Sequence, residues 1–159
     1  MKLIRGGTVV NANHTGRYDV LIVGEKIAAL IDPRSDILDS LEGWDCEILD
    51  ASGKYVIPGG VDSHVHLQLP MSDEATSNDT FESGTQAAAW GGTTTVIDFA
   101  GQIKGSSVPD AIESRLAEAE GQCAIDYSLH LSVGDVHAQS LIDIRNTVDS
   151  GITSFKLFM

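Results

Sequence analysis

Two histidines separated by one residue, His64 and His66, are the side chains in this sequence most able to do chemistry. They stand in a run of β-branched and apolar residues, for which we predict a buried strand over Tyr55–Ser63. Side chains at positions i and i+2 of a strand point to one face, roughly 6.6 Å apart at about 3.3 Å rise per residue. Two neutral imidazoles on one face suit a Zn²⁺-type ion, so the pair is a candidate metal site.

The residues before the pair strengthen this interpretation, because an isolated His-x-His is common by chance. The turn-forming run Pro58-Gly59-Gly60 precedes the pair, and Asp62 stands two positions before His64. Asp62 has two possible roles. Its carboxylate could orient a ligand imidazole, or it could accept backbone hydrogen bonds at the end of the strand.

Strands and helices alternate from Tyr55 onward. The predicted strands are Tyr55–Ser63, Thr93–Phe99, Ala124–Leu131 and Thr153–Phe158, and the predicted helices are Thr80–Trp90, Val108–Glu120 and Ala138–Ser150. Capping chemistry around Thr80, Pro109 in a first helical turn and Gly121 at a helix end support the helix boundaries. This alternation is typical of βα units in a parallel sheet, and hence of an α/β fold.

Residues 1–55 have a different pattern, with short strands separated by turns. The predicted strands are Leu3-Ile4, Thr8–Val10, Asp19–Val23, Lys26–Ile31 and Cys46–Leu49. The run Val23–Ile27 predicts a tight hairpin. These strands are too few for a closed barrel, so we expect a short all-β piece that needs a partner sheet. The sequence thus divides into residues 1–55 and 56–159.

The composition of the 159 residues excludes several classes of function. A net charge of −13, from 23 acidic and 10 basic side chains, argues against nucleic-acid binding and against anionic membrane surfaces. The first residues lack an apolar segment, so we expect no signal peptide, and no apolar run in the sequence is long enough to cross a bilayer. Cys46 and Cys123 form no metal-binding pattern and are expected as free thiols in a cytoplasmic protein.

Four stretches together resemble the cyclic amidohydrolases, most closely their dihydropyrimidinase/hydantoinase branch. These stretches are residues 58–68 (PGGVDSHVHLQ), 91–99 (GGTTTVIDF), 126–130 (DYSLH) and 151–159 (GITSFKLFM). They follow the family's order along the chain. The resemblance implies an amidohydrolase-like fold, in which a β-sandwich stands beside a TIM (β/α)8 barrel, here represented by its first strands.

The resemblance also implies a site with two divalent metal ions, which we expect to be Zn²⁺. By motif, His64 and His66 are metal ligands, and Lys156 is a lysine that CO₂ converts to a carbamate bridging both metals and serving catalysis. By position, Leu69, Met71 and Phe158 form an apolar wall for the substrate's ring substituent. The same three side chains could instead serve ordinary core packing.

The chemistry of Lys156 agrees with that implication. An ammonium group carries only hydrogen-bond donors, whereas a carbamate is an anion whose two oxygens can bridge ions about 3.5–4 Å apart. Lys156 stands in an apolar run where an unpaired ammonium would be costly to bury, although at a sheet edge it could reach solvent. His130, in another predicted strand, is expected to serve packing rather than metal binding.

The implied activity is the hydrolysis of dihydropyrimidines or 5-substituted hydantoins to N-carbamoyl amino acids. The family's other ligands, two His and one Asp, and a substrate-binding Tyr would lie beyond residue 159, so we expect a longer, tetrameric protein. Allantoinases and dihydroorotases are alternatives, although Gln68 stands where dihydroorotases typically have Arg. A non-catalytic scaffold related to dihydropyrimidinase is a further alternative, which the joint presence of His64, His66 and Lys156 disfavours.

Overall fold

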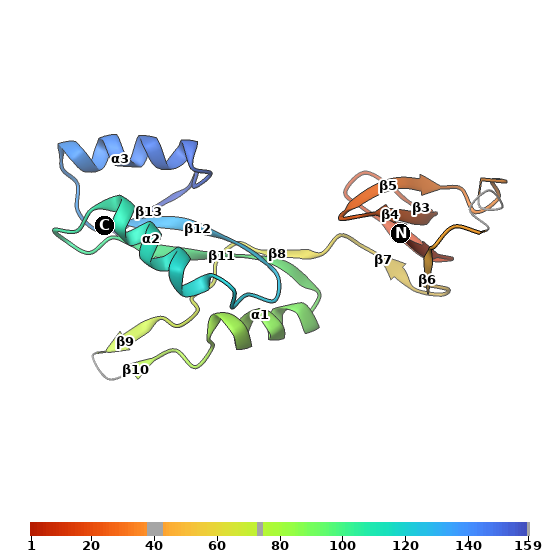
Figure 1. Ribbon diagram of the computed structural model, residues 1–159, viewed down its shortest axis with the longest axis horizontal. Coiled ribbons are helices and arrows are strands. Elements are labelled where there is room, and N and C mark those ends of the chain that lie inside the picture. Colours follow the sequence, from red (N-terminus) through yellow and green to blue (C-terminus); the bar gives the residue numbers. More distant parts are fainter. Residues whose placement is uncertain (38–42, 73–74, 159) are drawn as a thin grey trace. The chain divides into compact units, whose positions relative to one another are not determined.

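The structure, a computed structural model, describes residues 1–37, 43–72 and 75–158. The chain forms two compact units, Met1–Pro58 and Gly59–Met159 (Figure 1). Each unit has its own sheets, and the parallel sheet belongs to the second unit. Within the described residues, no helix combines the length and the apolar character needed to span a membrane.

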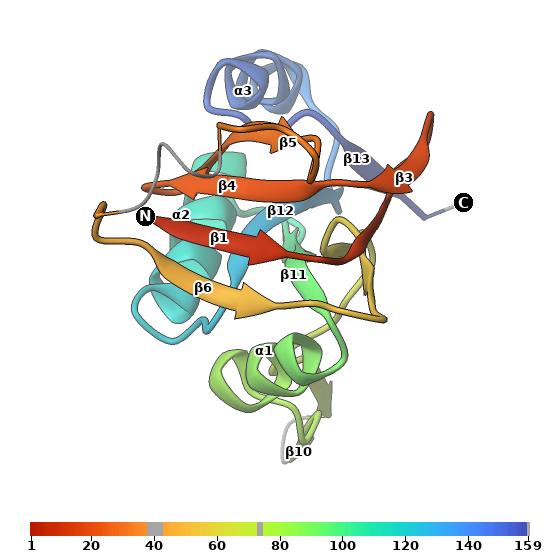
Figure 2. The ribbon, with the colours of Figure 1, turned by 90° about the vertical axis from the view of Figure 1, so that its right-hand side faces the viewer.

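The first unit contains two sheets. Its strands are β1 (Lys2–Arg5), β2 (Thr8–Val10), β3 (Thr15–Arg17), β4 (Asp19–Val23), β5 (Lys26–Ile31), β6 (Glu47–Asp50) and β7 (Tyr55–Val56). One sheet has the order β5-β4-β1-β6, whose strands lie side by side in Figure 2, and the other has the order β3-β2-β7. The predicted hairpin is confirmed, since Val23 pairs with Lys26 around Gly24, which has a φ of 61°.

The second unit is built on a four-stranded parallel sheet. Its strands are β8 (Gly60–Asp62), β11 (Thr93–Gly101), β12 (Asp126–Val133) and β13 (Phe155–Leu157), in the spatial order β13-β12-β11-β8. Strands that follow one another in the chain are therefore neighbours in space, and all the pairings are parallel. Because the pairings are parallel, the carboxyl ends of these strands meet at one edge of the sheet, which is where α/β proteins place their sites.

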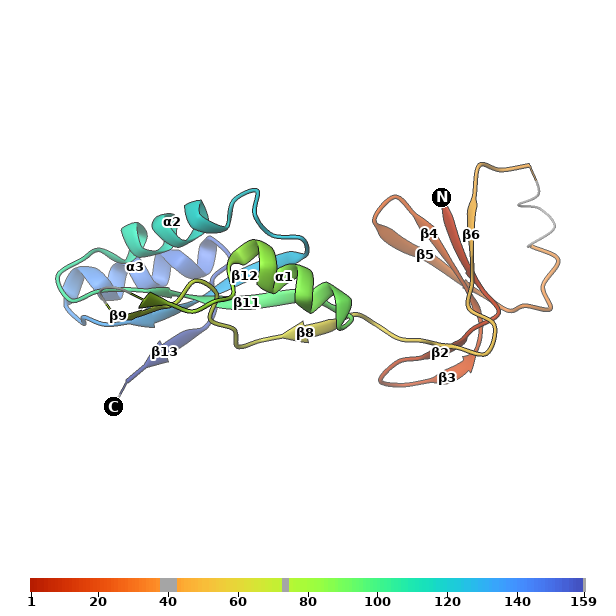
Figure 3. The same ribbon diagram turned by 90° about the horizontal axis from the view of Figure 1, so that it is seen from below.

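Three helices lie on one side of this sheet, as Figure 3 shows. They are α1 (Phe81–Trp90), α2 (Val108–Ala119) and α3 (Ala138–Asp149), each within one residue of its predicted bounds. Thr80 caps α1 by accepting the backbone N–H of Ser83, and Ser107 caps α2 in the same way from Asp110. These local caps explain why the helix boundaries could be predicted.

Two apolar clusters attach the helices to the sheet. The larger contains Ala100, Val108, Leu129, Leu131, Val133 and Ile152. The smaller contains Leu67, Phe81 and Ala119, so it joins the segment after β8 to α1 and α2. Gly84 of α1 permits this packing, because a Cβ there would stand 2.5 Å from Leu67 Cδ2.

A hairpin of β9 (Pro70–Ser72) and β10 (Ala75–Thr76) separates this segment from α1. Its base is closed by two backbone hydrogen bonds, from Gln68 N–H to the Asp79 carbonyl at 2.7 Å and from Ser77 N–H to the Leu69 carbonyl at 2.8 Å. Gln68 has a φ of 46° and accepts the Phe81 N–H through Oε1 at 3.1 Å. Here the chain turns sharply and is tied to the start of α1.

The prediction of a single buried strand over Tyr55–Ser63 is wrong. β7 and β8 belong to different sheets, and the intervening Pro58 has no N–H to donate to a ladder. Gly59 lies so close to Thr94 that a Cβ would stand 2.2 Å from Thr94 Oγ1. All of β8 is exposed, since β11 is its one partner among the residues that the structure describes.

Candidate metal centre

His64 and His66 follow β8 as an extended segment beside β11, beyond the end of the strand itself. The backbone N–H of Val65, which lies between them, donates to the Ile97 carbonyl at 3.1 Å. The two imidazole rings have centres 5.2 Å apart and stand nearly perpendicular, at 82°. Asp62 Oδ1 accepts the His64 backbone N–H at 3.2 Å, which is the backbone role of the two roles considered for this carboxylate.

The ring of Phe99 is the common contact of this region. Its centre lies 4.7 Å from that of His64 and 4.8 Å from that of His66, which is stacked on it with an interplanar angle of 27°. The Nζ atom of Lys156, from β13, lies 4.5 Å from the same ring centre. The three residues implied as metal ligands therefore gather around one side chain of β11.

His66 has properties that suit a metal ligand. Its Nδ1 is buried and has no hydrogen-bond partner among the described residues. Burial lowers the pKa of His66 below its usual value, and the positive charge of Lys156 and the neighbouring His64 lower it further. A neutral imidazole with a free lone pair is the form that binds a metal ion.

Lys156 is half-buried, and its amine also lies 5.1 Å from the ring centre of Phe158. An ammonium over aromatic faces is attracted by their negative quadrupole, so this placement stabilises the uncarboxylated form. Within residues 1–37, 43–72 and 75–158, no three His, Cys, Asp or Glu side chains cluster as a metal-ligand set. The chain therefore offers two imidazoles and one amine.

A cavity of about 800 Å³ in the second unit adjoins these residues. His66 and Lys156 line it, as do Leu69 and Phe158, two of the three residues predicted to contact substrate. Met71 lies on β9 with 68% of its surface exposed and is not part of the cavity wall. His64 also lies outside the wall, although its ring touches that of His66.

Sequence reasoning missed a buried ion pair beside this cavity. Arg115 of α2 and Asp98 of β11 are 9% and 1% exposed, and the guanidinium meets the carboxylate at 2.5 Å. A signal was present in the sequence, because Arg115 stands in the helical stripe that also contains Val108 and Ala119. A charged residue in an otherwise apolar stripe indicates a buried partner.

His130 of β12 takes part in hydrogen bonds within the protein. Its Nε2–H donates to the Ser63 carbonyl at 2.8 Å, and its Nδ1 accepts from the Ser154 hydroxyl. The ring also packs against Phe99, with centres 4.9 Å apart. Both nitrogens are thus engaged, which agrees with the packing role predicted for this residue.

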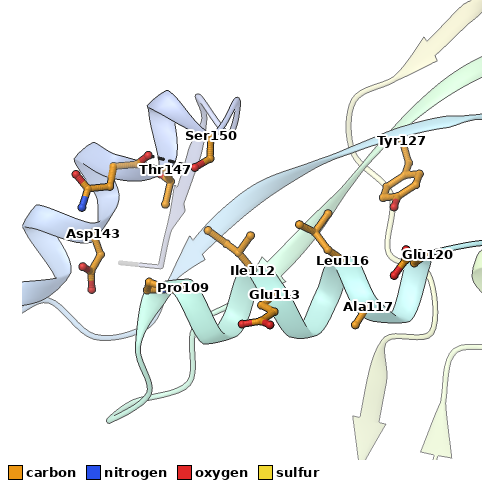
Figure 4. A pocket seen from close by; sticks show the side chains of 11 residues that line it. Pro109, Ile112, Glu113, Leu116, Ala117, Glu120, Tyr127, Asp143, Thr147 and Ser150 are labelled. Atoms are coloured by element: carbon orange, nitrogen blue, oxygen red, sulfur yellow. Dashed lines mark hydrogen bonds between the residues drawn. The ribbon is translucent and has the colours of Figure 1, made fainter.

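A second cavity, of about 670 Å³, lies between α2 and α3 and contains none of the predicted site residues (Figure 4).

Comparison with known sequences identifies relatives that match 99% of this chain. The Amidohydrolase family model matches residues 55–158. A D-hydantoinase of Streptomyces coelicolor is 46% identical over 157 residues, which cover 99% of this chain and 33% of that protein. A dihydropyrimidinase of Rattus norvegicus is 41% identical over 163 residues, covering 99% of this chain and 30% of that protein.

Solved structures agree with these sequence matches. The dihydropyrimidinase from Brevibacillus agri NCHU1002 has a TM-score of 0.89 and 42% identity, over 99% of this chain and 33% of that one. A D-hydantoinase from Bacillus sp. AR9 has a TM-score of 0.91 and 41% identity, over 100% of this chain and 33% of that one. This chain thus spans about a third of the length of these relatives. The predicted resemblance and the amidohydrolase-like fold are confirmed, and the chain belongs to the amidohydrolase family.

Proposed function

We propose that this chain forms part of a metal-dependent hydrolase that opens cyclic amides, with hydantoins and dihydropyrimidines as the substrate class. The observation that carries the proposal is the gathering of His64, His66 and Lys156 around Phe99. The relatives named D-hydantoinase and dihydropyrimidinase, which are more than 40% identical over nearly all of this chain, support the choice of substrate. Because the chain spans about a third of their length, the activity is proposed for the whole protein.

The residues present fit two divalent metal ions, which we propose to be Zn²⁺. The unpartnered Nδ1 of His66 and the adjacent ring of His64 supply nitrogen donors. Lys156 lies on the wall of the same cavity as His66, and as a carbamate it would supply two anionic oxygens. When bound, such a metal pair lowers the pKa of a water molecule and polarises the amide carbonyl.

The chain's own residues prepare this site in distinct ways. Burial lowers the pKa of His66, which favours the neutral imidazole over the charged one. The ammonium of Lys156 first loses one proton to give the neutral amine. This amine adds CO₂ and loses a second proton as the N–C bond forms, which leaves an anionic carbamate. Leu69 and Phe158, on the cavity wall, exclude water and contact the ring substituent of the substrate. Met71 is exposed and lies outside the cavity wall, so its contact with substrate stays a prediction.

In the whole protein we propose that the parallel sheet is part of a closed TIM barrel and that the two sheets of the first unit belong to a β-sandwich. Two further His and one Asp complete the ligand set, and four copies assemble. A cytoplasmic location agrees with Cys46 and Cys123, which are both free thiols. The alternative functions, allantoinase and dihydroorotase, are tested by comparing hydrolysis of allantoin and dihydroorotate with hydrolysis of hydantoin and dihydrouracil.

The test is zinc content and hydrolysis in the whole protein and in its His66→Asn and Lys156→Ala variants. We expect about two zinc ions per wild-type chain, a substantial loss of zinc in both variants, and hydrolysis of hydantoin and dihydrouracil in preference to allantoin and dihydroorotate. His14→Asn is the matched control, because His14 is an exposed histidine of the first unit. A wild-type protein without zinc and without hydrolysis would contradict the proposed function.

A further inference from the structure

We propose that Arg115 is a positioning residue, which holds the His64–His66 segment in register with Phe99. Its NH2 group donates to the backbone carbonyl of Leu67, the residue directly after His66. The same group meets Asp98 Oδ2 at 2.5 Å. One guanidinium therefore binds both Leu67, which follows His66, and Asp98, which precedes Phe99. The inference rests on the proposed function, because positioning matters only if the imidazoles bind metal.

Asp98 links Arg115 to the backbone of Phe99. Its Oδ1 accepts the Phe99 backbone N–H at 2.7 Å, while its Oδ2 meets Arg115. The carboxylate is 1% exposed and thus shielded from competing water. Charge-assisted hydrogen bonds between buried groups are shorter and stronger than neutral ones, so the link resists displacement.

Leu67 is held in place through both its backbone and its side chain. The side chain is 6% exposed and packs with Phe81 and Ala119, while Arg115 binds the carbonyl. The guanidinium carbon of Arg115 also lies 4.6 Å from the centre of the Phe81 ring, which fixes the plane of the guanidinium. A planar, forked donor is required here, because a lysine ammonium could not meet the carbonyl, the carboxylate and the ring in the same geometry.

Arg115 lines the cavity, yet its two terminal nitrogens are already engaged. NH1 meets Glu118 at 2.5 Å, and NH2 serves both Leu67 and Asp98. A substrate carbonyl or carboxylate would have to displace the buried Leu67 and Asp98 in order to bind NH2. This favours positioning of the segment over direct contact with substrate.

The experiment compares zinc affinity, by chelator competition, with steady-state kinetics in the whole protein. For Arg115→Lys we expect zinc affinity to fall about 10–100-fold, as is typical when a group that orients a ligand is lost, together with a lower kcat and a KM changed less than twofold. Arg145→Lys, an exposed arginine of α3, is the matched control and should behave as wild type. Wild-type zinc affinity and kcat in Arg115→Lys would overturn the positioning role.

Two further variants separate positioning from a general loss of stability. Glu118→Gln removes the half-exposed partner but leaves the bonds to Leu67 and Asp98, so zinc affinity should stay within about twofold of wild type. Arg115→Met combined with Asp98→Asn removes both charges together and leaves no unpaired buried ion, so this variant should fold but bind zinc weakly. Should Arg115→Lys not fold, the double variant decides: zinc binding as tight as wild type would overturn the proposal. A wild-type protein that binds no zinc would instead refute the proposed function.

Discussion

The Nζ atom of Lys156 lies 4.5 Å from the centre of the Phe99 ring. These two residues come from different strands of the parallel sheet, and the same ring stacks on His66. The ring of Phe99 therefore contacts both the amine of Lys156 and the imidazole of His66. An aromatic face accommodates both, because its quadrupole attracts the cation and its surface packs against the imidazole.

Replacing Phe99 with leucine should loosen this arrangement. Loss of the cation–π and ring-packing contacts predicts a lower free energy of unfolding, by about 1–2 kcal/mol, and weaker zinc binding. Denaturant unfolding and chelator competition measure the two effects. Phe155→Leu is the control, because Phe155 is an exposed neighbour of Lys156 on β13. Equal zinc affinity in Phe99→Leu and wild type would show that the ring has no such role.

The lowered pKa of His66 predicts a pH dependence of stability in the metal-free protein. A folded-state pKa below 6.5 means that the unfolded chain binds more protons than the folded chain between these two values. The free energy of unfolding should therefore decline as the pH falls below 6.5 and continue to decline down to the folded-state pKa. An NMR titration in bicarbonate-free buffer measures that pKa, and His66→Asn should make the stability profile flatter. A His66 pKa at or above 6.5 would contradict the prediction.

Two glycines on the cavity wall should respond differently to alanine. A Cβ on Gly134 would stand 2.0 Å from the backbone oxygen of Gln102, whereas a Cβ on Gly101 would meet nothing within 4 Å. Gly134→Ala must push the segments that follow β11 and β12 apart, which should cost about 1–3 kcal/mol of stability. Gly101→Ala should remain within about 0.5 kcal/mol of wild type. Thermal and denaturant unfolding measure the stability of the two variants. Equal stability of Gly134→Ala and Gly101→Ala would contradict the prediction.

Substrate preference should depend on Leu69 more than on Met71. Leu69 lines the cavity, whereas Met71 is exposed outside it. Leu69→Ala should reduce the preference in kcat/KM for 5-phenylhydantoin over unsubstituted hydantoin by about tenfold, because apolar contacts with the ring substituent are lost. Met71→Ala should change this ratio less than twofold. The opposite order would place Met71 in the substrate wall, as the family resemblance implied.

The helices could be predicted from the sequence because their ends are encoded locally. Thr80 and Pro109 act within one turn of their own positions, so a short window contains the needed information. The division of the run after Tyr55 into two strands depends instead on distant partners. Tyr55 pairs with Thr8 in the first unit, and Val61 pairs with Thr95 in the second. No local pattern shows which sheet a strand will join.

The candidate site divides in the same way. His64 and His66 could be found from spacing, because side chains two apart in extended backbone share a face. Lys156 required the resemblance to a family, since an isolated lysine in an apolar run has several explanations. The bond from Arg115 to Leu67 spans 48 residues, and its acceptor is a backbone carbonyl, which every residue possesses. Such a contact emerges only from the packed fold.

The hydrogen bonds at the base of the β9–β10 hairpin have an evolutionary consequence. Gln68 is joined to Asp79, and Leu69 to Ser77, so the two ends of the intervening loop are fixed to each other. Insertions or deletions between Pro70 and Thr76 can therefore change the length of this hairpin without shifting the imidazoles. Selection on this hairpin and selection on the proposed metal ligands can then act on separate stretches of one short segment.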